Sequence, residues 1–274
     1  MQRADLHLHT VFSDGEKTPE QLLAALKKEG IQIFSLTDHD VSPDHSEFAA
    51  LAKREGLTYI PGVEFTTYDR EQIHILGYGY KRTDAFLQRL SAIREQRERR
   101  NLTILNNLGK VGVHISPEEV DHNASGFFGT LQIIRAMVKK GYVPDYPAGM
   151  RDYFYTGGPG YVSQERISPH EAVRLIKSAG GVPVLAHPGK MDTLSLPEQK
   201  EMIATLKEEG LMGIECYYSS HTESETARYL KWAKELNLLQ TVGSDFHGVE
   251  RPEHVGHPVH FLSAAETELL CGKN

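Results

Sequence analysis

The stretch ADLHLHT (residues 4–10) is the first of seven short β-rich runs, and the order of these runs predicts the fold. The other six are QIFSLTDH (32–39), LTYIPGVEFT (57–66), QIHILGYGY (72–80), VPVLAHP (182–188), MGIECYY (212–218) and LQTVGSDFH (239–247). Amphipathic stretches that predict helices lie between most of these runs, at residues 19–30, 44–55, 168–179, 197–209 and 223–236. Strands that alternate with helices favour parallel pairing in βα units, and seven strands favour a barrel over an open sheet.

Residues 81–160 interrupt this alternation. A long charged helix is predicted at 84–108 and a shorter one at 130–142, before the Tyr/Gly/Pro-rich stretch YFYTGGPGY (153–161). We therefore expect a helical insertion at 81–160, which separates the two parts of the main domain at 1–80 and 161–274. A cap that faces the substrate is one use of such an insertion.

The overall composition limits the classes of function. Of the 274 residues 39% are hydrophobic, as in ordinary globular proteins, and the formal net charge of −7 argues against a general nucleic-acid or membrane-surface binder. A small anionic substrate stays open, because bound cations reverse the local field. The N-terminal residues lack a signal-peptide core, and no apolar run approaches the roughly 18 residues of a membrane span. Two cysteines, Cys216 and Cys271, are too few for a disulfide framework, so we expect a reduced, cytoplasmic setting.

Residues of the metal-ligand type gather at the ends of the predicted strands. Nine of them would share one pocket at the mouth of a parallel barrel: His7, His9, Asp14, His39, Glu64, His74, His187, Asp245 and His247. Each alone has an ordinary structural explanation, such as a turn residue, a helix cap or a core histidine. Their joint placement at successive strand ends favours a metal site.

The types of ligand indicate which ions would bind. Imidazole and carboxylate without thiolate suit Zn²⁺, Mn²⁺ or Fe²⁺, and we expect Mn²⁺ foremost. Nine ligands are too many for one tetrahedral ion, so about two to three divalent ions with a bridging carboxylate are expected.

Six motifs contain these residues: DLHLHTVFSDG (5–15), LTDHD (36–40), PGVEFT (61–66), HILGYG (74–79), LAHPG (185–189) and GSDFHG (243–248). Together they resemble the PHP (polymerase and histidinol phosphatase) superfamily. The stand-alone members with a helical insertion, which include nucleoside 3′,5′-bisphosphate phosphatases, are most similar. The resemblance implies a distorted (βα)7 barrel and a trinuclear site. It implies one ion on His7, His9, Glu64 and Asp245, a second on Glu64, His74 and His187, and a third on Asp14, His39 and His247.

The insertion departs from this pattern where relatives carry Arg-Pro-His or Arg-Thr-His, because this chain has Thr130, Leu131 and Gln132 there. Arg135 and GPGYV (158–162) do match. The substrate-binding candidates are therefore Arg135, Arg97 from the run REQRERR (94–100), and His221. Arg97 has a solvated helix face as its alternative, and His221 a cap on the next helix.

The expected chemistry is hydrolysis of a phosphoester by a metal-bound hydroxide. Among the ligands, Glu64, Asp245 and His247 are the expected catalytic residues. A phosphatase acting on a nucleotide or sugar phosphate, including a 3′,5′-bisphosphate, is the first hypothesis. A phosphodiesterase acting on a cyclic phosphate or an oligonucleotide end is the alternative. Histidinol-phosphate hydrolysis, amide hydrolysis and a non-catalytic metal-binding module rank lower.

Overall fold

The structure is a computed structural model that describes residues 1–44, 46–122, 124, 126, 128–163, 166–248 and 254–272. The chain divides into two compact units, one of Met1–Leu90 with Arg166–Asn274 and one of Ser91–Glu165. The division falls later than residue 80, within helix α3 (Asp84–Lys110), because the first turns of α3 pack on the first unit through Phe86, which contacts Phe65 and Tyr80. Among the described residues, no helix is both long and apolar enough to cross a membrane.

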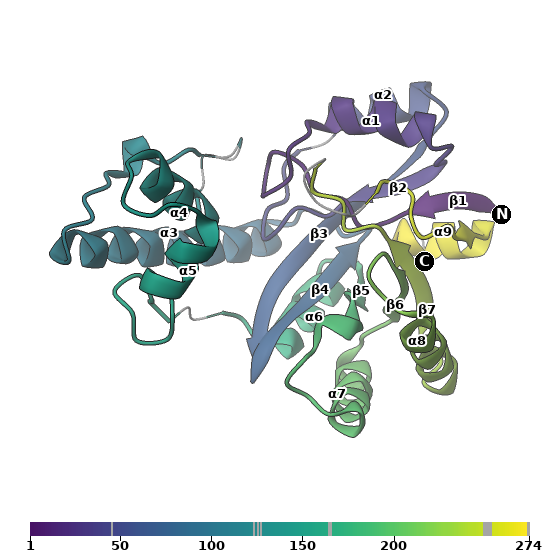
Figure 1. Cartoon of the computed structure of the whole chain (residues 1–274). Helices are drawn as coiled ribbons and strands as arrows, with labels where there is room; N and C mark the ends of the chain where they lie inside the picture. Colours follow the sequence, from purple (N-terminus) through teal and green to yellow (C-terminus); the bar gives the residue numbers. More distant parts are fainter. Residues whose placement is uncertain are drawn as a thin grey trace. The chain divides into compact units, whose positions relative to one another are not determined.

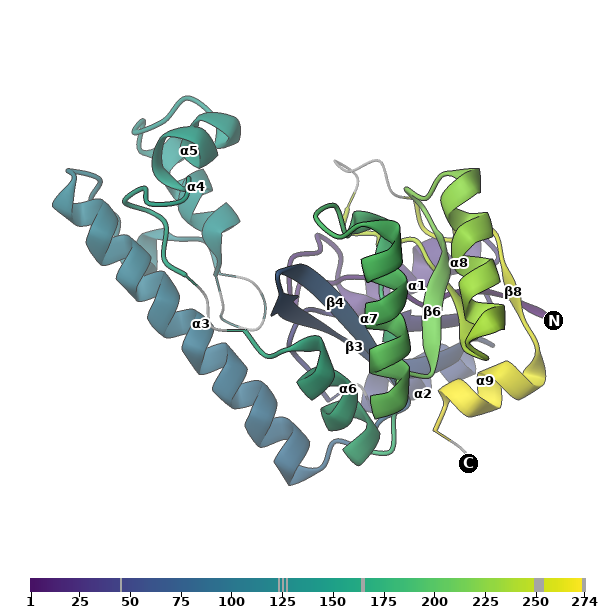
Figure 2. The same ribbon diagram turned by 90° about the horizontal axis from the view of Figure 1, so that it is seen from below.

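The first unit is built on a sheet of eight strands among the described residues (Figures 1 and 2). They are β1 (Gln2–Asp5), β2 (Ile33–Leu36), β3 (Thr58–Asp69), β4 (Glu71–Tyr78), β5 (Val182–Leu185), β6 (Gly213–Tyr218), β7 (Leu239–Gly243) and β8 (Phe261–Leu262). The spatial order is β7-β6-β5-β4-β3-β2-β1-β8. The predicted α/β class is confirmed, and the sheet is strongly curled into a half-barrel.

The strand directions correct the expectation of seven parallel βα units. Strand β4 runs antiparallel to both β3 and β5, and β8, which was not predicted, runs antiparallel to β1. Arg70 alone separates β3 from β4, and a parallel pair would need a long crossover, so the chain returns as a hairpin. The pairs β1–β2, β2–β3, β5–β6 and β6–β7 are parallel, as predicted.

Backbone hydrogen bonds also join the segment after β1 to the segment that includes the end of β7. Leu6 N donates to Val242 O at 3.0 Å, and Asp245 N donates to His7 O at 2.9 Å. These bonds bring residues from opposite ends of the chain into one place. They matter for function because both segments carry ligand-type side chains.

Among the described residues, two apolar clusters pack against the sheet. One draws residues from β1 to β5, β7 and β8, including Ile33, Leu76 and Val184. The other joins helices α1 (Pro19–Lys28) and α2 (Ser46–Arg54) to β2 through residues such as Leu26 and Phe34. Because successive strand residues face opposite sides of the sheet, both clusters can form on the same strands. Most ligand-type residues follow a strand end, whereas Glu64 lies within β3 and His74 within β4.

The remaining helices of this unit are α6 (Pro169–Ser178), α7 (Leu196–Glu209), α8 (Glu223–Glu235) and α9 (Ala264–Leu270). The helices predicted from sequence are all present with small differences in their bounds, and α9 was not predicted; His45, which one predicted helix included, lies outside the described residues. Local signals explain the bounds. Thr18 accepts a hydrogen bond from Gln21 N ahead of Pro19, and Gly210 ends α7 in the left-handed conformation.

The second unit has a hydrophobic core of its own. Its elements are the rest of α3, the 3₁₀ turn η1 (Pro117–Glu119), α4 (Thr130–Lys139) and α5 (Tyr146–Tyr153). Ile104 and Leu108 of α3 pack in one cluster with Ile133 and Met137 of α4 and with Phe154. A separate core is what an independently packed insertion needs.

Candidate metal centre

The ligand-type side chains of the first unit converge because the strands that precede them pair with one another. His7 and His9 follow β1, His39 follows β2, and Asp245 and His247 follow β7. Isolated bridges continue the pairing beyond the strands, between Leu8 and Phe246 and between His39 and Glu64. Thus four segments far apart in the sequence are held in register by backbone hydrogen bonds.

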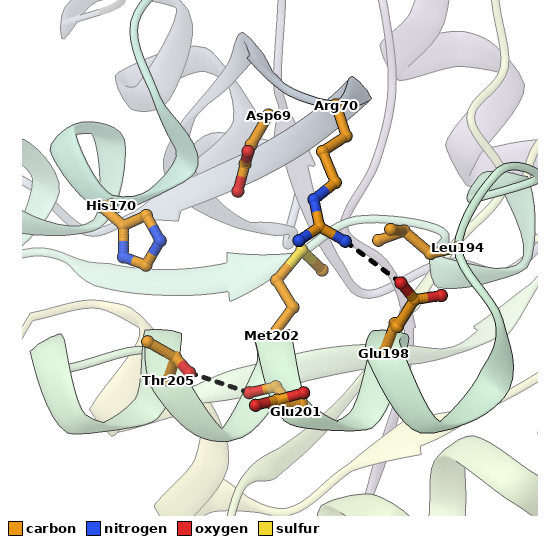
Figure 3. A pocket seen from close by; sticks show the side chains of 8 residues that line it. All are labelled: Asp69, Arg70, His170, Leu194, Glu198, Glu201, Met202 and Thr205. Atoms are coloured by element: carbon orange, nitrogen blue, oxygen red, sulfur yellow. Dashed lines mark hydrogen bonds and ion pairs between the residues drawn. The ribbon is translucent and has the colours of Figure 1, made fainter.

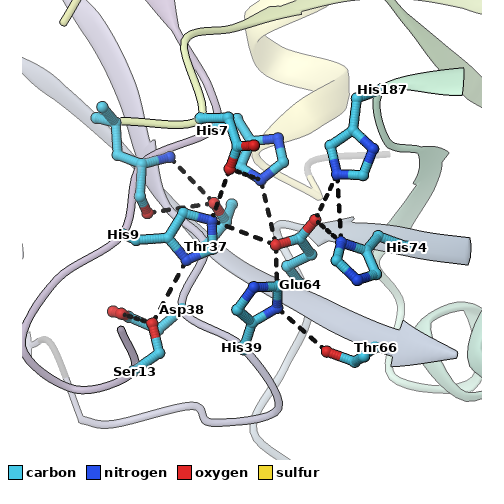
Figure 4. A network of polar contacts seen from close by, with 12 residues as sticks. His7, His9, Ser13, Thr37, Asp38, His39, Glu64, Thr66, His74 and His187 are labelled. Carbon is cyan, nitrogen blue, oxygen red and sulfur yellow. Dashed lines mark hydrogen bonds and ion pairs between the residues drawn. The ribbon is translucent and has the colours of Figure 1, made fainter. Parts of the chain in front are cut away.

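Glu64 lies at the centre of the cluster and is completely buried (Figure 4). Its Oε2 atom is 3.3 Å from His7 Nε2, 3.2 Å from His9 Nε2 and 3.1 Å from His39 Nδ1. Asp245 Oδ1 approaches the same histidines, at 3.3 Å from His7 Nε2 and 3.1 Å from His9 Nε2. Two carboxylates and two imidazoles therefore direct donor atoms to one point.

The other oxygen of Glu64 faces a second set of histidines. Glu64 Oε1 is 2.7 Å from His74 Nδ1 and 3.1 Å from His187 Nε2, and these two nitrogens are 3.2 Å apart (Figure 4). On the far side of His9, Asp14 Oδ1 lies 3.3 Å from His247 Nε2 and 3.5 Å from His9 Nδ1. Glu64 thus lies between two donor sets.

Within the described part of the chain, three groups have ligand atoms mutually within 4.8 Å. They are His7, His9, Glu64 and Asp245; His9, Asp14, His39 and His247; and His39, Glu64 and His74. Three atoms at the centre, His7 Nε2, His9 Nε2 and Glu64 Oε2, are buried and have no hydrogen-bond partner among the described residues. Buried polar atoms without partners are costly, so this donor set fits cations. These clusters are consistent with several divalent metal sites.

The charges of the cluster support the same conclusion. Burial lowers the pKa of His9, but Asp245 and Glu64 outweigh burial and raise that pKa to about 10. For His7, burial is likewise outweighed by Glu64, Glu215 and Asp245, so its pKa lies well above the ordinary value. Protons on these two imidazoles balance the negative charge of the carboxylates. Bound metal cations would balance the same charge.

The remaining ligand-type groups respond to the same neighbours. Burial alone would raise the pKa of Glu64, but His74, His39 and His7 hold it well below its usual range. Burial lowers the pKa of His39, and the attraction of Glu64 does not reverse that shift. The cluster therefore keeps Glu64 ionised and His39 neutral, the forms in which both bind metal.

Glu215 on β6 orients two of the histidines, and sequence reasoning missed it. Its Oε1 accepts from His7 Nδ1 at 3.0 Å and its Oε2 accepts from the His187 backbone N–H at 2.7 Å. A Cβ on Gly243 would lie 2.2 Å from both Glu215 Oε1 and His7 Cβ, so glycine is needed for this approach. The signal in the sequence was a carboxylate within the otherwise apolar strand GIECYY.

Two further contacts fix the orientation of site residues. His247 Nδ1 donates to Asp245 O at 2.7 Å, which leaves Nε2 directed at Asp14. Asp38 accepts from Thr10 N at 2.8 Å and from Ser13 Oγ at 2.6 Å, and so shapes the loop that carries Asp14. Asp38 is therefore a carboxylate that supports the ligand-bearing loop.

Two site residues occupy backbone conformations that L-residues rarely adopt. His187 has φ 22° and Asp245 has φ 57°. Such conformations cost on the order of 1–3 kcal/mol each and persist where the surroundings enforce them. Here the enforcing contacts are the bonds of His187 N to Glu215 and of Asp245 N to His7 O.

The predicted substrate-binding residues have different surroundings. Arg97 is half-buried on α3 and Arg135 is exposed on α4, both in the second unit. His221 lies in the first unit, where its Nδ1 contacts Cys216 O at 3.1 Å and its Nε2 accepts from Gly189 N at 3.1 Å. Both ring nitrogens of His221 thus bind the protein, and Thr222, not His221, is the N-cap of α8.

Lys190 and Tyr218, which sequence reasoning did not select, adjoin the cluster. Lys190 Nζ is 2.9 Å from Asp245 Oδ2, and Tyr218 OH donates to that same oxygen at 2.8 Å. Burial raises the pKa of Tyr218, as does Asp245, so the phenol remains a donor. A single tyrosine in a strand, or a single lysine in a turn, is not a sequence signal for a functional site. The sequence therefore did not indicate Tyr218 or Lys190.

A separate cavity of about 220 Å³ lies against the β3–β4 turn and α7 (Figure 3). Arg70, at that turn, is 3.1 Å from Glu198, and His170 at the start of α6 is 3.0 Å from Glu209. Arg70 and Glu198 thus pair with each other within the cavity, and its lining does not include the donor atoms of the histidine cluster. The cluster remains the candidate site.

Comparisons with known proteins agree with this geometry. The PHP domain family matches residues 5–143. The chain is 32% identical over 263 residues to phosphoribosyl 1,2-cyclic phosphate 1,2-diphosphodiesterase of Eggerthella lenta, with 93% of this chain and 98% of the relative covered. It is also 32% identical over 263 residues to the 3′,5′-nucleoside bisphosphate phosphatase of Chromobacterium violaceum, with 94% and 92% covered. An amidohydrolase structure from the latter organism, with bound sulfate and no metal, superposes with a TM-score of 0.82 at 30% identity, covering 97% of this chain and 96% of the other.

Proposed function

Because the chain belongs to the PHP domain family and is a hydrolase of phosphoester bonds, we propose that it releases phosphate from a small nucleotide or sugar phosphate. The single observation that carries this proposal is the set of buried, unpartnered donor atoms around Glu64. The similarity to a bisphosphate phosphatase along nearly the whole chain supports a monoester in a nucleotide.

About two to three divalent ions, Mn²⁺ foremost, would bind the nine ligand-type side chains. We assign one ion to His7, His9, Glu64 and Asp245; a second to Glu64, His74 and His187; and a third to Asp14, His39 and His247. Supporting contacts are the short approaches of these donor atoms to the two oxygens of Glu64 and to Asp14 Oδ1. His39 also approaches Glu64, so it is placed between the first and third sets.

Bound ions would lower the pKa of a coordinated water and neutralise charge on the phosphoryl oxygens. The protein residues supply the rest. Glu64 and Asp245 carry the negative charge that balances the ions, since the imidazole ligands are neutral. His247, held by its bond to Asp245 O, directs Nε2 at the Asp14 side of the cluster.

We assign the second unit the role of a cap that contributes cations to substrate. Arg97 and Arg135 are its candidates, because guanidinium groups bind phosphate oxygens in pairs. His221 contributes indirectly in this proposal, by holding Gly189 and with it the turn that follows His187. The segment to which this role is assigned is the second unit, Ser91–Glu165.

A substrate panel with Mn²⁺ tests the proposal. It contains a nucleoside 3′,5′-bisphosphate, a cyclic nucleotide or sugar phosphate, a sugar monophosphate and a 5′-phosphorylated oligonucleotide. We expect release of inorganic phosphate from a small monoester, loss of that activity with chelator, and a raised KM in Arg135→Ala. Absence of phosphoester hydrolysis across the panel in metal-loaded protein would overturn the proposal.

The second candidate is a phosphodiesterase acting on a cyclic phosphate. It is favoured by the similarity to the Eggerthella lenta enzyme, which covers 98% of that protein. The same panel separates the two, because opening a cyclic diester yields a monoester without releasing inorganic phosphate. Cleavage of the 5′-phosphorylated oligonucleotide would instead indicate that the enzyme acts on oligonucleotide ends.

A further inference from the structure

The carboxylate of Asp245 divides its two oxygens between different partners. Oδ1 faces the histidines, at 3.1 Å from His9 Nε2 and 3.3 Å from His7 Nε2. Oδ2 accepts from Tyr218 OH at 2.8 Å and from Lys190 Nζ at 2.9 Å. One oxygen thus belongs to the metal-ligand cluster, while the other holds a cation at the edge of that cluster.

Lys190 is far more accessible than the residue it contacts. Its side chain is 51% exposed, whereas that of Asp245 is 5% exposed. The ammonium also lies 5.0 Å from the centre of the Tyr218 ring. The ammonium group has three N–H donors, and its contacts with Asp245 Oδ2 and the Tyr218 ring do not use all three. It can therefore donate a further hydrogen bond on its exposed side.

The turn that carries Lys190 is held rigidly beside His187. Lys190 ends the 3₁₀ turn η2 (Pro188–Lys190), and its backbone N–H donates to His187 O at 2.9 Å. Gly189 N donates to His221 Nε2 at 3.1 Å, and a Cβ on Gly189 would lie 2.7 Å from the His221 ring. The direction of Lys190 is therefore set by the same turn that sets His187.

A purely structural role does not account for this lysine. Tyr218 already donates to Asp245 Oδ2, and an ion pair with a half-exposed lysine contributes little to stability. A cation beside a metal-ligand cluster has a larger effect on an incoming anion, because it adds a positively charged hydrogen-bond donor at the edge of the site.

We propose that Lys190 is a substrate-binding residue whose ammonium contacts a phosphoryl oxygen beside the ion on His7, His9, Glu64 and Asp245. The assignment rests on the proposed phosphoesterase function, and it specifies where the anionic group of the substrate binds. Tyr218 and Asp245 position the ammonium, while the turn η2 brings it within the same site as His187. The ligand class is a phosphate monoester or inorganic phosphate.

The test compares Lys190→Met and Lys190→Arg with the wild type, using inorganic phosphate as the probe. Calorimetry gives the phosphate Kd of Mn²⁺-loaded and of chelated protein, and elemental analysis gives the metal content. We expect Lys190→Met to raise the phosphate Kd about tenfold or more in both forms, with metal content unchanged. Lys190→Arg should recover part of the affinity. Lys200→Met, which removes a surface partner of Glu235, is the matched control and should keep the wild-type Kd.

A phosphate Kd within twofold of wild type in Lys190→Met would overturn the assignment. So would loss of bound metal in that variant, since Lys190 would then act by supporting the ligand Asp245. Hydrolysis is measured separately. If the wild type binds phosphate through Lys190 but hydrolyses no phosphoester, the assignment of Lys190 stands and the proposed function fails.

Discussion

Glu64 is completely buried, and its two carboxylate oxygens approach the rings of five histidines. The sequence alone predicts this residue at the mouth of a barrel. Its burial follows from the imidazoles that surround it, His7, His9 and His39 on one oxygen and His74 and His187 on the other. A buried carboxylate shared by two donor sets is the natural bridge between two ions.

Glu64→Gln should therefore lower kcat by about 100-fold or more and reduce the bound metal. The change keeps the size of the side chain but removes its charge and one good ligand oxygen. Glu64→Asp keeps the charge with a shorter reach and should retain more metal than Glu64→Gln. His247→Ala, at the third donor set, should lose one ion and keep part of the activity.

The measurements are kcat, elemental analysis and thermal unfolding on each variant. Unfolding must be included because the residue is buried. Full metal occupancy with most of the activity in Glu64→Gln would show that Glu64 does not bridge the ions.

The raised pKa of His9 predicts how chelated protein responds to pH. In the unfolded chain its pKa is near the ordinary 6.5, whereas in the folded protein Asp245 and Glu64 raise it to about 10 despite burial. The folded state thus binds more protons between these values. The stability from His9 is complete below pH 6.5 and is lost as pH rises towards 10, by up to about 1.4 kcal/mol per pH unit for one proton.

Denaturant unfolding of chelated protein at pH 6.5, 8 and 9.5 checks this expectation. The free energy of unfolding should fall across the series, and His9→Gln should reduce that slope. Binding of Mn²⁺ near pH 7.5 should release protons, because the ion replaces those on His9 and His7. An unfolding free energy that does not change from pH 6.5 to 9.5 would contradict the charged state of His9.

Among the elements, the contact between β6 and β7 determines the orientation of His7. These strands pair in parallel, and Gly243 at the end of β7 leaves room for Glu215 of β6 to reach His7 Nδ1. The pairing of β6 with β7 thus determines how His7, which lies in neither strand, is oriented. The pairing of these strands positions the ligands His7 and Asp245.

Gly243→Ala should accordingly weaken metal binding by about 10- to 100-fold, because its Cβ would displace Glu215 or His7. Titration with Mn²⁺ against a competing chelator gives the affinity. Gly109→Ala on α3 is the control, since a Cβ there meets only His114 at 3.7 Å among the atoms within 4 Å, and it should leave metal affinity unchanged. Equal affinities in the two variants would mean that Glu215 does not orient His7.

At the scale of the chain, the ligand-type residues come from six strand regions, β1 to β5 and β7, and from both ends of the sequence. Ions bound to them would link segments that the backbone joins only at a few hydrogen bonds. Because a ligand that binds only the folded state stabilises it, metal should raise the Tm of the first unit.

Protein purified without chelator should contain about two to three divalent ions per chain, and removal of these ions should lower its Tm. Elemental analysis and calorimetry before and after chelation, and after reconstitution with Mn²⁺, are the measurements. Content near zero after reconstitution would contradict the assignment of the cluster as a metal centre.

Local patterns in the chain were sufficient to predict most of the helices and strands, the α/β class and the residues of metal-ligand type. Periodicity, capping residues and histidines at strand ends are properties of short segments, so they can be read without knowing the neighbours in space. The helix bounds, for example, follow from caps such as Thr18 and Thr222.

The direction of β4, the link from Glu215 to His7 and the contact of Lys190 with Asp245 could not be predicted in this way. Lys190 and Asp245 are 55 positions apart, and Glu215 and His7 are 208 apart, so no short segment contains either pair. Which buried carboxylate meets which histidine depends on how the sheet curls, and that curl results from all the strands packing together.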